Sequence, residues 1–180
     1  MQHLIIFIIL LLIIGLTFTV IRWRGGLHMT FSQHAAANRW SKIYYALLFL
    51  VTLPLLMLFF IAWFVPTKHL PNAFLWFAAT AIIFQIICTW VPEEGEGKRI
   101  VHRILTGISG VALLPLVGII ATSTYLSMIL RNVAWVALFL MMVLLGIALV
   151  NQKGYRYALL LQVGYYAIFF TVIVITTYLA

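Results

Sequence analysis

The sequence contains no aspartate, and its only acidic residues are Glu93, Glu94 and Glu96 in one short segment. The chain therefore cannot supply an aspartyl nucleophile, an aspartate metal ligand or an aspartate proton relay. A single cysteine, Cys88, excludes a disulfide within the chain. Charged residues make up 8% of the sequence, whereas a soluble domain carries roughly a quarter. Because so few polar groups cannot cover a water-exposed surface, we expect the protein to fold in lipid.

What the sequence does contain is hydrophobic residues, which make up 66% of it and gather in six long runs. A helix needs roughly 20 apolar residues to span a bilayer. We therefore predict an all-α, polytopic membrane protein, a bundle of six transmembrane helices with short loops that forms one domain over residues 1–180. The predicted spans are about 4–21, 43–65, 73–91, 104–121, 133–150 and 157–179.

The ends of these runs refine the prediction. No Lys or Arg precedes the first run and no small-x-small motif follows it, so we expect a retained span rather than a cleaved signal peptide. The longest connection, 23–42, has room for one short surface helix.

Lys and Arg are distributed unevenly among the predicted loops. Nine of the eleven fall in the first, third and fifth loops, and one each in the second and fourth. By the positive-inside rule, this predicts a multi-pass protein of the cell membrane with both termini outside. The net charge of +8 is then explained by attraction to anionic headgroups, so we expect membrane lipids as partners and no nucleic acid.

Small and polar residues within the runs suggest how the helices pack. Gly107, Gly110 and Gly118 recur near one face of the fourth span, as expected where helix backbones approach closely. Gln85 and Gln162 are the amides deep in the third and sixth spans. We favour a hydrogen bond between them over the alternative that they line a polar pocket.

The candidate functional residues are polar side chains on the face that the odd-numbered loops share. They are Ser32, His34, Arg39, His102, Arg103 and Arg156. We predict that they converge in one interfacial pocket that binds an anionic group, because arginine offers bidentate donors and a helix N-terminus before the fourth span adds N–H groups. The alternative is that each side chain separately reaches into the headgroup layer.

Other chemistries have weaker support in the sequence. A Ser-His-Asp triad lacks its aspartate, and no nucleotide-binding glycine motif is present. A zinc site built from His28, His34 and His102 is conceivable, but their spacing matches no helical ligand pair. We therefore expect no metal and no cofactor.

Three stretches carry a resemblance to a known family. They read FSQHAAANRWSKIYYALLFL, VPEEGEGKRIVHRILTGISGVALLPLVGI and KGYRYALLLQVGYYAIFF. In this order they resemble an uncharacterised family of small prokaryotic membrane proteins, catalogued as domain of unknown function 998. The resemblance implies a six-span bundle and a functional face at the odd-numbered loops, but no reaction. The matching positions are Ser32, Pro92, Glu93, His102, Pro115, Gly154 and Arg156.

Three functions remain open at this point. The first is a non-catalytic protein that binds a lipid headgroup or a membrane partner, either another protein or a second copy of the chain, at its basic face. The second is a small transporter or channel with a polar path past Gln85 and Gln162. The third is an interfacial lipid-headgroup hydrolase or transferase with His102 as acid/base.

Overall fold

The computed structural model describes residues 1–23, 26, 28–91, 96–150 and 157–179, with only the backbone of 149 and 150. The fold class is confirmed, because six helical segments are long and apolar enough to cross a membrane. They are α1 (Leu4–Arg22), α3 (Arg39–Phe59) with its continuation, α5 (Ala73–Trp90), α6 (Glu96–Thr122), α7 (Met128–Val150) and α8 (Ala158–Leu179). A short helix, α2 (Phe31–Ala35), lies in the connection expected to hold one.

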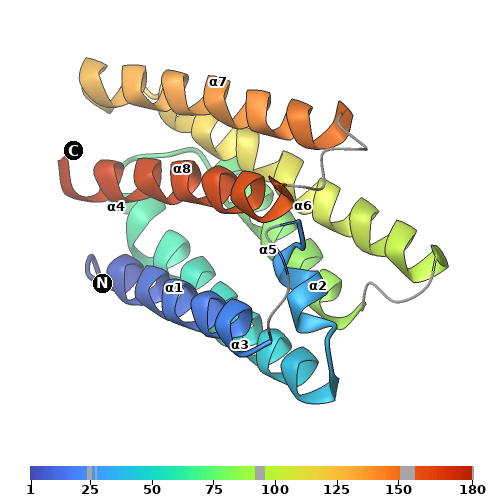
Figure 1. Cartoon of the computed structure of the whole chain (residues 1–180). Helices are drawn as coiled ribbons and strands as arrows, with labels where there is room; N and C mark the ends of the chain where they lie inside the picture. Colours follow the sequence, from blue (N-terminus) through green and yellow to red (C-terminus); the bar gives the residue numbers. More distant parts are fainter. Residues whose placement is uncertain (24–25, 27, 92–95, 151–156, 180) are drawn as a thin grey trace.

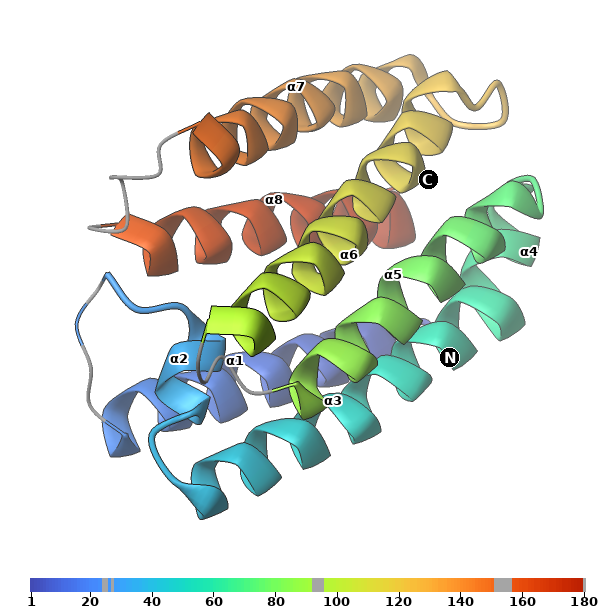
Figure 2. The ribbon, with the colours of Figure 1, turned by 90° about the vertical axis from the view of Figure 1, so that its right-hand side faces the viewer.

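The helices pack mostly in chain order, α1 against α3, α3 against α5, α5 against α6, α6 against α7 and α7 against α8. Between α8 and α1 the contact is much weaker, so the bundle is poorly closed there. Both chain ends lie at one end of the bundle, which we name the termini end, and α2 lies at the other, which we name the α2 end (Figures 1 and 2).

The second span contains two irregularities that the sequence prediction passed over. Pro54 lies inside α3, and the helix then continues as a π-helical turn, η1 (Phe60–Phe64), and a last short turn, α4 (Val65–Thr67). Proline lacks an N–H donor, and a π-turn changes which side chains share a face. The span therefore ends two residues later than predicted, beyond Pro66.

The fourth span corrects a prediction that bears on the site. We expected it to begin near residue 104, but α6 begins at Glu96. The charged residues Lys98 and Arg99 are good helix formers, so the helix extends beyond its apolar run. His102 consequently lies in the second turn of α6, where its backbone N–H is bonded within the helix. The expected N–H groups of a helix terminus are not available at His102.

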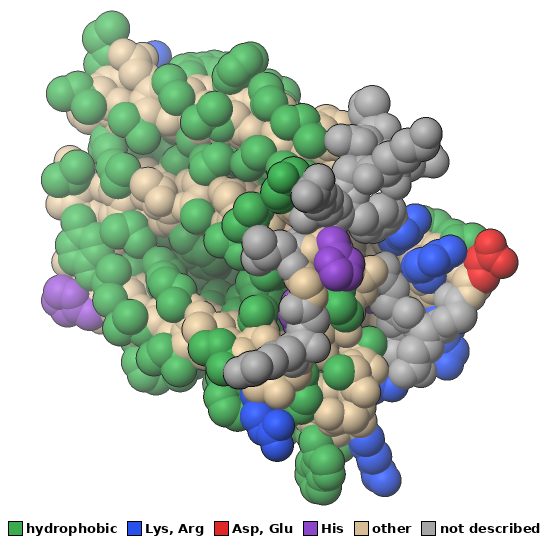
Figure 3. Space-filling model, in the orientation of Figure 1, with side chains coloured by type: hydrophobic (Ala, Val, Ile, Leu, Met, Phe, Trp, Pro, Cys, Tyr) green, Lys and Arg blue, Asp and Glu red, His purple; other side chains and the backbone are tan. Residues whose placement is uncertain are grey.

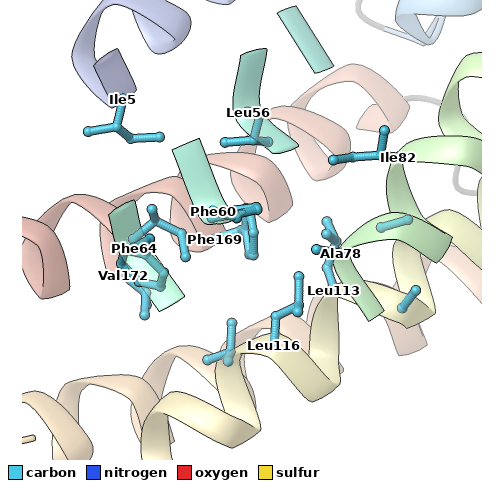
Figure 4. Close-up of a cluster of buried hydrophobic side chains, with 14 of the residues drawn as sticks. Ile5, Leu56, Phe60, Phe64, Ala78, Ile82, Leu113, Leu116, Phe169 and Val172 are labelled. Carbon is cyan, nitrogen blue, oxygen red and sulfur yellow. The ribbon is translucent and has the colours of Figure 1, made fainter. Parts of the chain in front are cut away.

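Aromatic side chains fill the core toward the termini end. Phe59, Phe60, Phe64 and Phe74 are at most 1% exposed, and Phe169 on α8 is 2% exposed. The rings of Phe60 and Phe74 meet edge to face with centroids 5.2 Å apart, an arrangement that aromatic pairs prefer. Figure 4 shows part of this cluster, with side chains from α1, η1, α5, α6 and α8 directed toward one another.

Glycine packing differs from the prediction. A Cβ added to Gly107 or Gly110 would meet no heavy atom within 4 Å, and one at Gly118 would lie 3.9 Å from Leu138. These glycines therefore do not mark a close approach of helices, and that prediction is wrong. The close approach is at Gly15 on α1, where a Cβ would lie 2.6 Å from a methyl group of Leu48 on α3.

Polar contacts connect α1, α8 and the α4–α5 turn at the termini end. The His3 Nδ1 atom lies 3.0 Å from the Tyr178 hydroxyl, and the Gln2 amide donates to the Thr177 carbonyl over 3.4 Å. Lys68 Nζ donates to the same carbonyl, also over 3.4 Å, and lies 5.6 Å from the centre of the Trp63 ring. Burial lowers the pKa of Lys68 below its ordinary value.

Candidate functional site

A cavity of about 360 Å³ lies at the α2 end, and we name it the interfacial cavity. Ser32 on α2 and His102 on α6 line it, together with Arg39 and Lys42 from the start of α3. Figure 3 shows Lys and Arg side chains gathered mostly at this end, whereas the flanks of the bundle are hydrophobic. The cavity therefore has two basic side chains in its lining and lies at the end of the bundle where most Lys and Arg side chains gather.

Local hydrogen bonds fix the turn between α2 and α3. Thr30 begins α2 with a capping box, in which its hydroxyl accepts from the Gln33 N–H and the Gln33 side chain accepts from the Thr30 N–H. Asn38 and Ser41 form the same reciprocal pair at the start of α3. Two capped helix starts within nine residues hold Ser32 and Arg39 at the same cavity.

His102 and Cys88 lie in contact on one wall of the interfacial cavity. The His102 Nδ1–H donates to the Val91 carbonyl over 2.8 Å. Cys88 Sγ lies 3.3 Å from Nδ1 and 3.5 Å from Nε2 of the same ring. A sulfur in line with either nitrogen would be much farther from the other, so the sulfur lies over the ring face. This contact is not the in-line thiol–imidazole hydrogen bond that activates a nucleophile.

The other candidate residues lie elsewhere. His34 is 1% exposed, and its Nδ1 lies 2.9 Å from the Trp23 carbonyl oxygen, away from the cavity lining. Arg103 is exposed on α6 and does not line the cavity. Arg156 lies outside the described residues. The structure thus brings together Ser32, Arg39 and His102, and leaves His34 and Arg103 outside the cavity.

Lys42 and Cys88 also line the cavity, although neither was among the candidates from the sequence. Lys42 entered the prediction only as a topology signal, yet it follows Arg39 by three residues, so both share one face of α3. Cys88 precedes the end of α5 by two residues, and nothing in its local pattern marks it.

The three histidines weighed as zinc ligands are separated. His28 is exposed, His34 is buried against Trp23, and His102 faces Cys88. Within the described parts of the chain, no group of three or more metal-ligating side chains lies close enough to hold an ion.

A second, larger cavity of about 680 Å³ lies between α1 and α8, and we name it the lateral cavity. Its lining is mostly apolar and comes from α1, α3, α5, α6 and α8, with Phe31 of α2 at one end. Figure 3 shows a hollow with hydrophobic side chains between α8 and α1. Its size is in the range of ligand sites, roughly 300–1,000 Å³.

The two cavities adjoin. Tyr45 lines both, and the neighbouring residues Phe31 and Ser32 line one each. On α5, Gln85 lines the lateral cavity and Cys88, one turn farther along, lines the interfacial cavity. The basic and apolar chambers are therefore neighbours, with Tyr45 in the lining of both.

Side-chain amides in the lateral cavity correct another expectation. Gln162 accepts a hydrogen bond from the Phe31 N–H over 3.2 Å. Gln85 accepts from the Tyr166 hydroxyl over 3.4 Å and lies 3.4 Å from the Ser109 hydroxyl, which donates to the Ala81 carbonyl over 2.9 Å. The amides thus bond to different partners rather than to each other, and both line the lateral cavity.

Six helices long and apolar enough to cross a membrane indicate a multi-pass membrane protein, with a cavity lined by basic residues at one end and a mostly apolar cavity between α1 and α8. No known family model matches the chain, and no curated protein or solved structure is significantly similar to it. The resemblance to domain of unknown function 998 stays a prediction.

Proposed function

We propose that the protein binds one anionic membrane lipid, with the headgroup in the interfacial cavity and an acyl chain in the lateral cavity. The observation that supports this most is the adjacency of the two cavities, which share Tyr45 as a common wall. A lipid has a polar headgroup next to apolar chains, so its binding site needs a polar compartment next to an apolar one. The interfacial and lateral cavities provide these two compartments.

Charge complementarity supports an anionic headgroup. Arg39 and Lys42 line the interfacial cavity, and each basic residue near a membrane surface attracts anionic lipid by about 1 kcal/mol. The planar guanidinium of Arg39 also suits bidentate hydrogen bonding to phosphate. Ser32 adds a hydroxyl on the opposite wall, from α2.

The weak contact between α8 and α1 supports entry of the chain from the bilayer. A lipid that slides between these two helices keeps its chain in an apolar environment throughout. Following the charge distribution, we place the protein in the cell membrane with the α2 end at the cytoplasmic face.

Binding without covalent catalysis is favoured by the geometry at His102 and Cys88. The Nδ1–H of His102 donates to the Val91 carbonyl, which leaves Nε2 as the acceptor of the ring. A general base needs this free nitrogen in line with the proton that it accepts, but the Cys88 sulfur lies over the ring face. Turning the ring to bring Nε2 in line with Cys88 would break the 2.8 Å bond to Val91.

Lipid titration of the purified protein by native mass spectrometry tests the proposal. We expect tighter binding of dioleoylphosphatidylglycerol than of zwitterionic dioleoylphosphatidylcholine. Replacing both Arg39 and Lys42 by Gln should weaken phosphatidylglycerol binding by roughly thirtyfold, since two contacts of about 1 kcal/mol are lost. Arg131→Gln, at the opposite end of the bundle, is the matched control. Equal affinity for the two lipids, or an unchanged affinity in the double variant, would contradict the proposal.

A further inference from the structure

We infer that the bound lipid is an ester-linked diacyl glycerolipid, recognised by hydrogen bonds from the side-chain amides of Gln85 and Gln162 to its two ester carbonyls. This rests on the proposed function and names the class of lipid that the same site takes. Three observations carry it, namely the orientation of each amide, its position in the lateral cavity and its depth in the membrane.

The orientation of the Gln162 amide follows from its partner. The backbone N–H of Phe31 lies 3.2 Å from one terminal atom of this amide. Because a backbone N–H can only donate, that atom is the oxygen Oε1, and the other atom is the nitrogen. Among the residues that the structure describes, no acceptor lies within hydrogen-bond distance of this nitrogen. Gln162 lines the lateral cavity, so its N–H groups remain as donors there.

Gln85, on α5, lines the same cavity. Its Oε1 accepts from the Tyr166 hydroxyl over 3.4 Å, whereas the nearby Ser109 hydroxyl gives its proton to the Ala81 carbonyl over 2.9 Å. With Oε1 facing Tyr166, the amide nitrogen has no acceptor in the described parts of the chain. Gln85 is only 7% exposed, so an acceptor supplied by a ligand in the cavity would satisfy this donor.

Both amides lie at one depth. Gln162 follows the start of α8 by four residues, and Gln85 precedes the end of α5 by five. At 1.5 Å per residue, each lies about 6–7.5 Å below the helix end at the α2 side. The polar layer of a bilayer is roughly 5–8 Å thick on each side of the hydrocarbon core. With the α2 ends of α5 and α8 taken as the water-facing edge of that layer, the donors lie at its base, where a glycerolipid carries its ester carbonyls between phosphate and chains.

The linkage chemistry distinguishes this ligand from close relatives. An ester offers a carbonyl oxygen, which is a strong acceptor, whereas a diether lipid of the same headgroup and chain length lacks that oxygen. The diether would leave the donors of Gln85 and Gln162 unpaired. The site should thus separate two lipids that have the same charge and nearly the same shape.

The test compares dioleoylphosphatidylglycerol with its dioleyl diether analogue, titrated against the purified full-length protein by native mass spectrometry. We expect the wild type to bind the ester about tenfold more tightly, from two hydrogen bonds of about 0.5–1.5 kcal/mol each. Gln85→Leu and Gln162→Leu should each reduce the preference to about threefold, and the double variant should show none. Thr122→Val, on an exposed part of α6 outside the cavity lining, should keep the tenfold preference.

Equal binding of the two lipids by the wild type would overturn the inference and leave the proposed function standing. A preference for the ester lipid that persists in the double variant would overturn the inference too, because groups other than Gln85 and Gln162 would then recognise the ester. Failure of both lipids to bind saturably would instead contradict the proposed function, and the inference with it.

Discussion

The two ends of this bundle are built differently. At the termini end, α1, α8 and the α4–α5 turn are joined by polar contacts of His3, Lys68 and Gln2, and aromatic rings fill the space beneath them. From the α2 end toward the middle of the bundle and beyond, the same two helices, α1 and α8, border a cavity of about 680 Å³, and α2 covers one end of it. The bundle is thus closed at the termini end and hollow along the side where α1 and α8 face each other.

This difference indicates where stability and binding reside. Lipid chains are as apolar as the helices, so packing and hydrogen bonds must hold the helices together. The termini end supplies both through Phe60, Phe64 and Phe74 and the contacts of Thr177. The α2 end leaves polar side chains facing a cavity, which favours a ligand over compact packing.

The largest expected effect comes from removing an aromatic ring at the closed end. Phe64 is completely buried, and its ring lies 5.5 Å from that of Phe74. We expect Phe64→Ala to destabilise the protein by about 2–3 kcal/mol. This is less than the 3–5 typical of aqueous cores, because lipid also solvates the exposed ring.

Phe170→Ala is the matched change at the lateral cavity, which Phe170 lines from the middle of α8. It should cost less than about 1 kcal/mol, because the cavity already limits its contacts. Heating in detergent, followed by size-exclusion chromatography of the surviving monodisperse fraction, measures both variants. Equal losses of stability in the two variants would show that the aromatic cluster and the lateral cavity contribute equally to stability, which would contradict the comparison.

Two glycine-to-alanine substitutions should have smaller effects on stability, and these effects should be opposite in sign. We expect Gly107→Ala to stabilise the protein by about 0.5–1 kcal/mol, because alanine favours helix and nothing lies within 4 Å of the added methyl group. Gly15→Ala should destabilise it by about 1 kcal/mol, because the methyl group would meet Leu48 at 2.6 Å. The same thermal assay reports both, and a destabilised Gly107→Ala would restore the small-residue packing face predicted from the sequence.

The smallest effect is a pH dependence at the closed end. Burial lowers the pKa of Lys68, so between the folded pKa and the ordinary value of 10.5 the unfolded chain binds more protons. Stability should therefore rise with pH toward 10.5 in the wild type. This rise should be absent from Lys68→Met and present in Lys98→Met, which removes an exposed lysine at the α2 end. Parallel Tm profiles of the wild type and Lys68→Met would contradict this account.

Much of this architecture could be predicted from composition. Each of the six apolar runs forms one span, because a helix pairs its own backbone N–H and C=O groups where the bilayer offers no water to bond with. The start of α6 at Glu96 was missed because hydrophobicity marks where a helix is buried, not where it begins. The glycine prediction failed for a related reason, since a Cβ at Gly107 or Gly110 would meet no heavy atom within 4 Å, even though the Tyr165 hydroxyl of α8 bonds to the Gly110 carbonyl.

The site was only partly predictable. Short loops place Ser32, Arg39 and His102 on one side, and their convergence in the interfacial cavity then depends on the capped turn between α2 and α3. His34 has the same local chemistry, but it turns toward Trp23. No sequence pattern predicts the lateral cavity, because a helix face that lines a cavity has the same apolar residue pattern as one that packs against another helix.

Photo-crosslinking with phosphatidylglycerol that carries a diazirine at mid-chain tests most directly whether the acyl chain occupies the lateral cavity. Purified protein in mixed micelles is irradiated, and the labelled peptides are mapped with and without a tenfold excess of unlabelled phosphatidylglycerol. We expect labelling of α1 and α8 residues that line the lateral cavity, such as Leu16, Val163 and Phe170, and we expect the unlabelled lipid to reduce it. Labelling spread over the outward face of α7, at exposed residues such as Trp135 and Phe139, and unaffected by the competitor would contradict it.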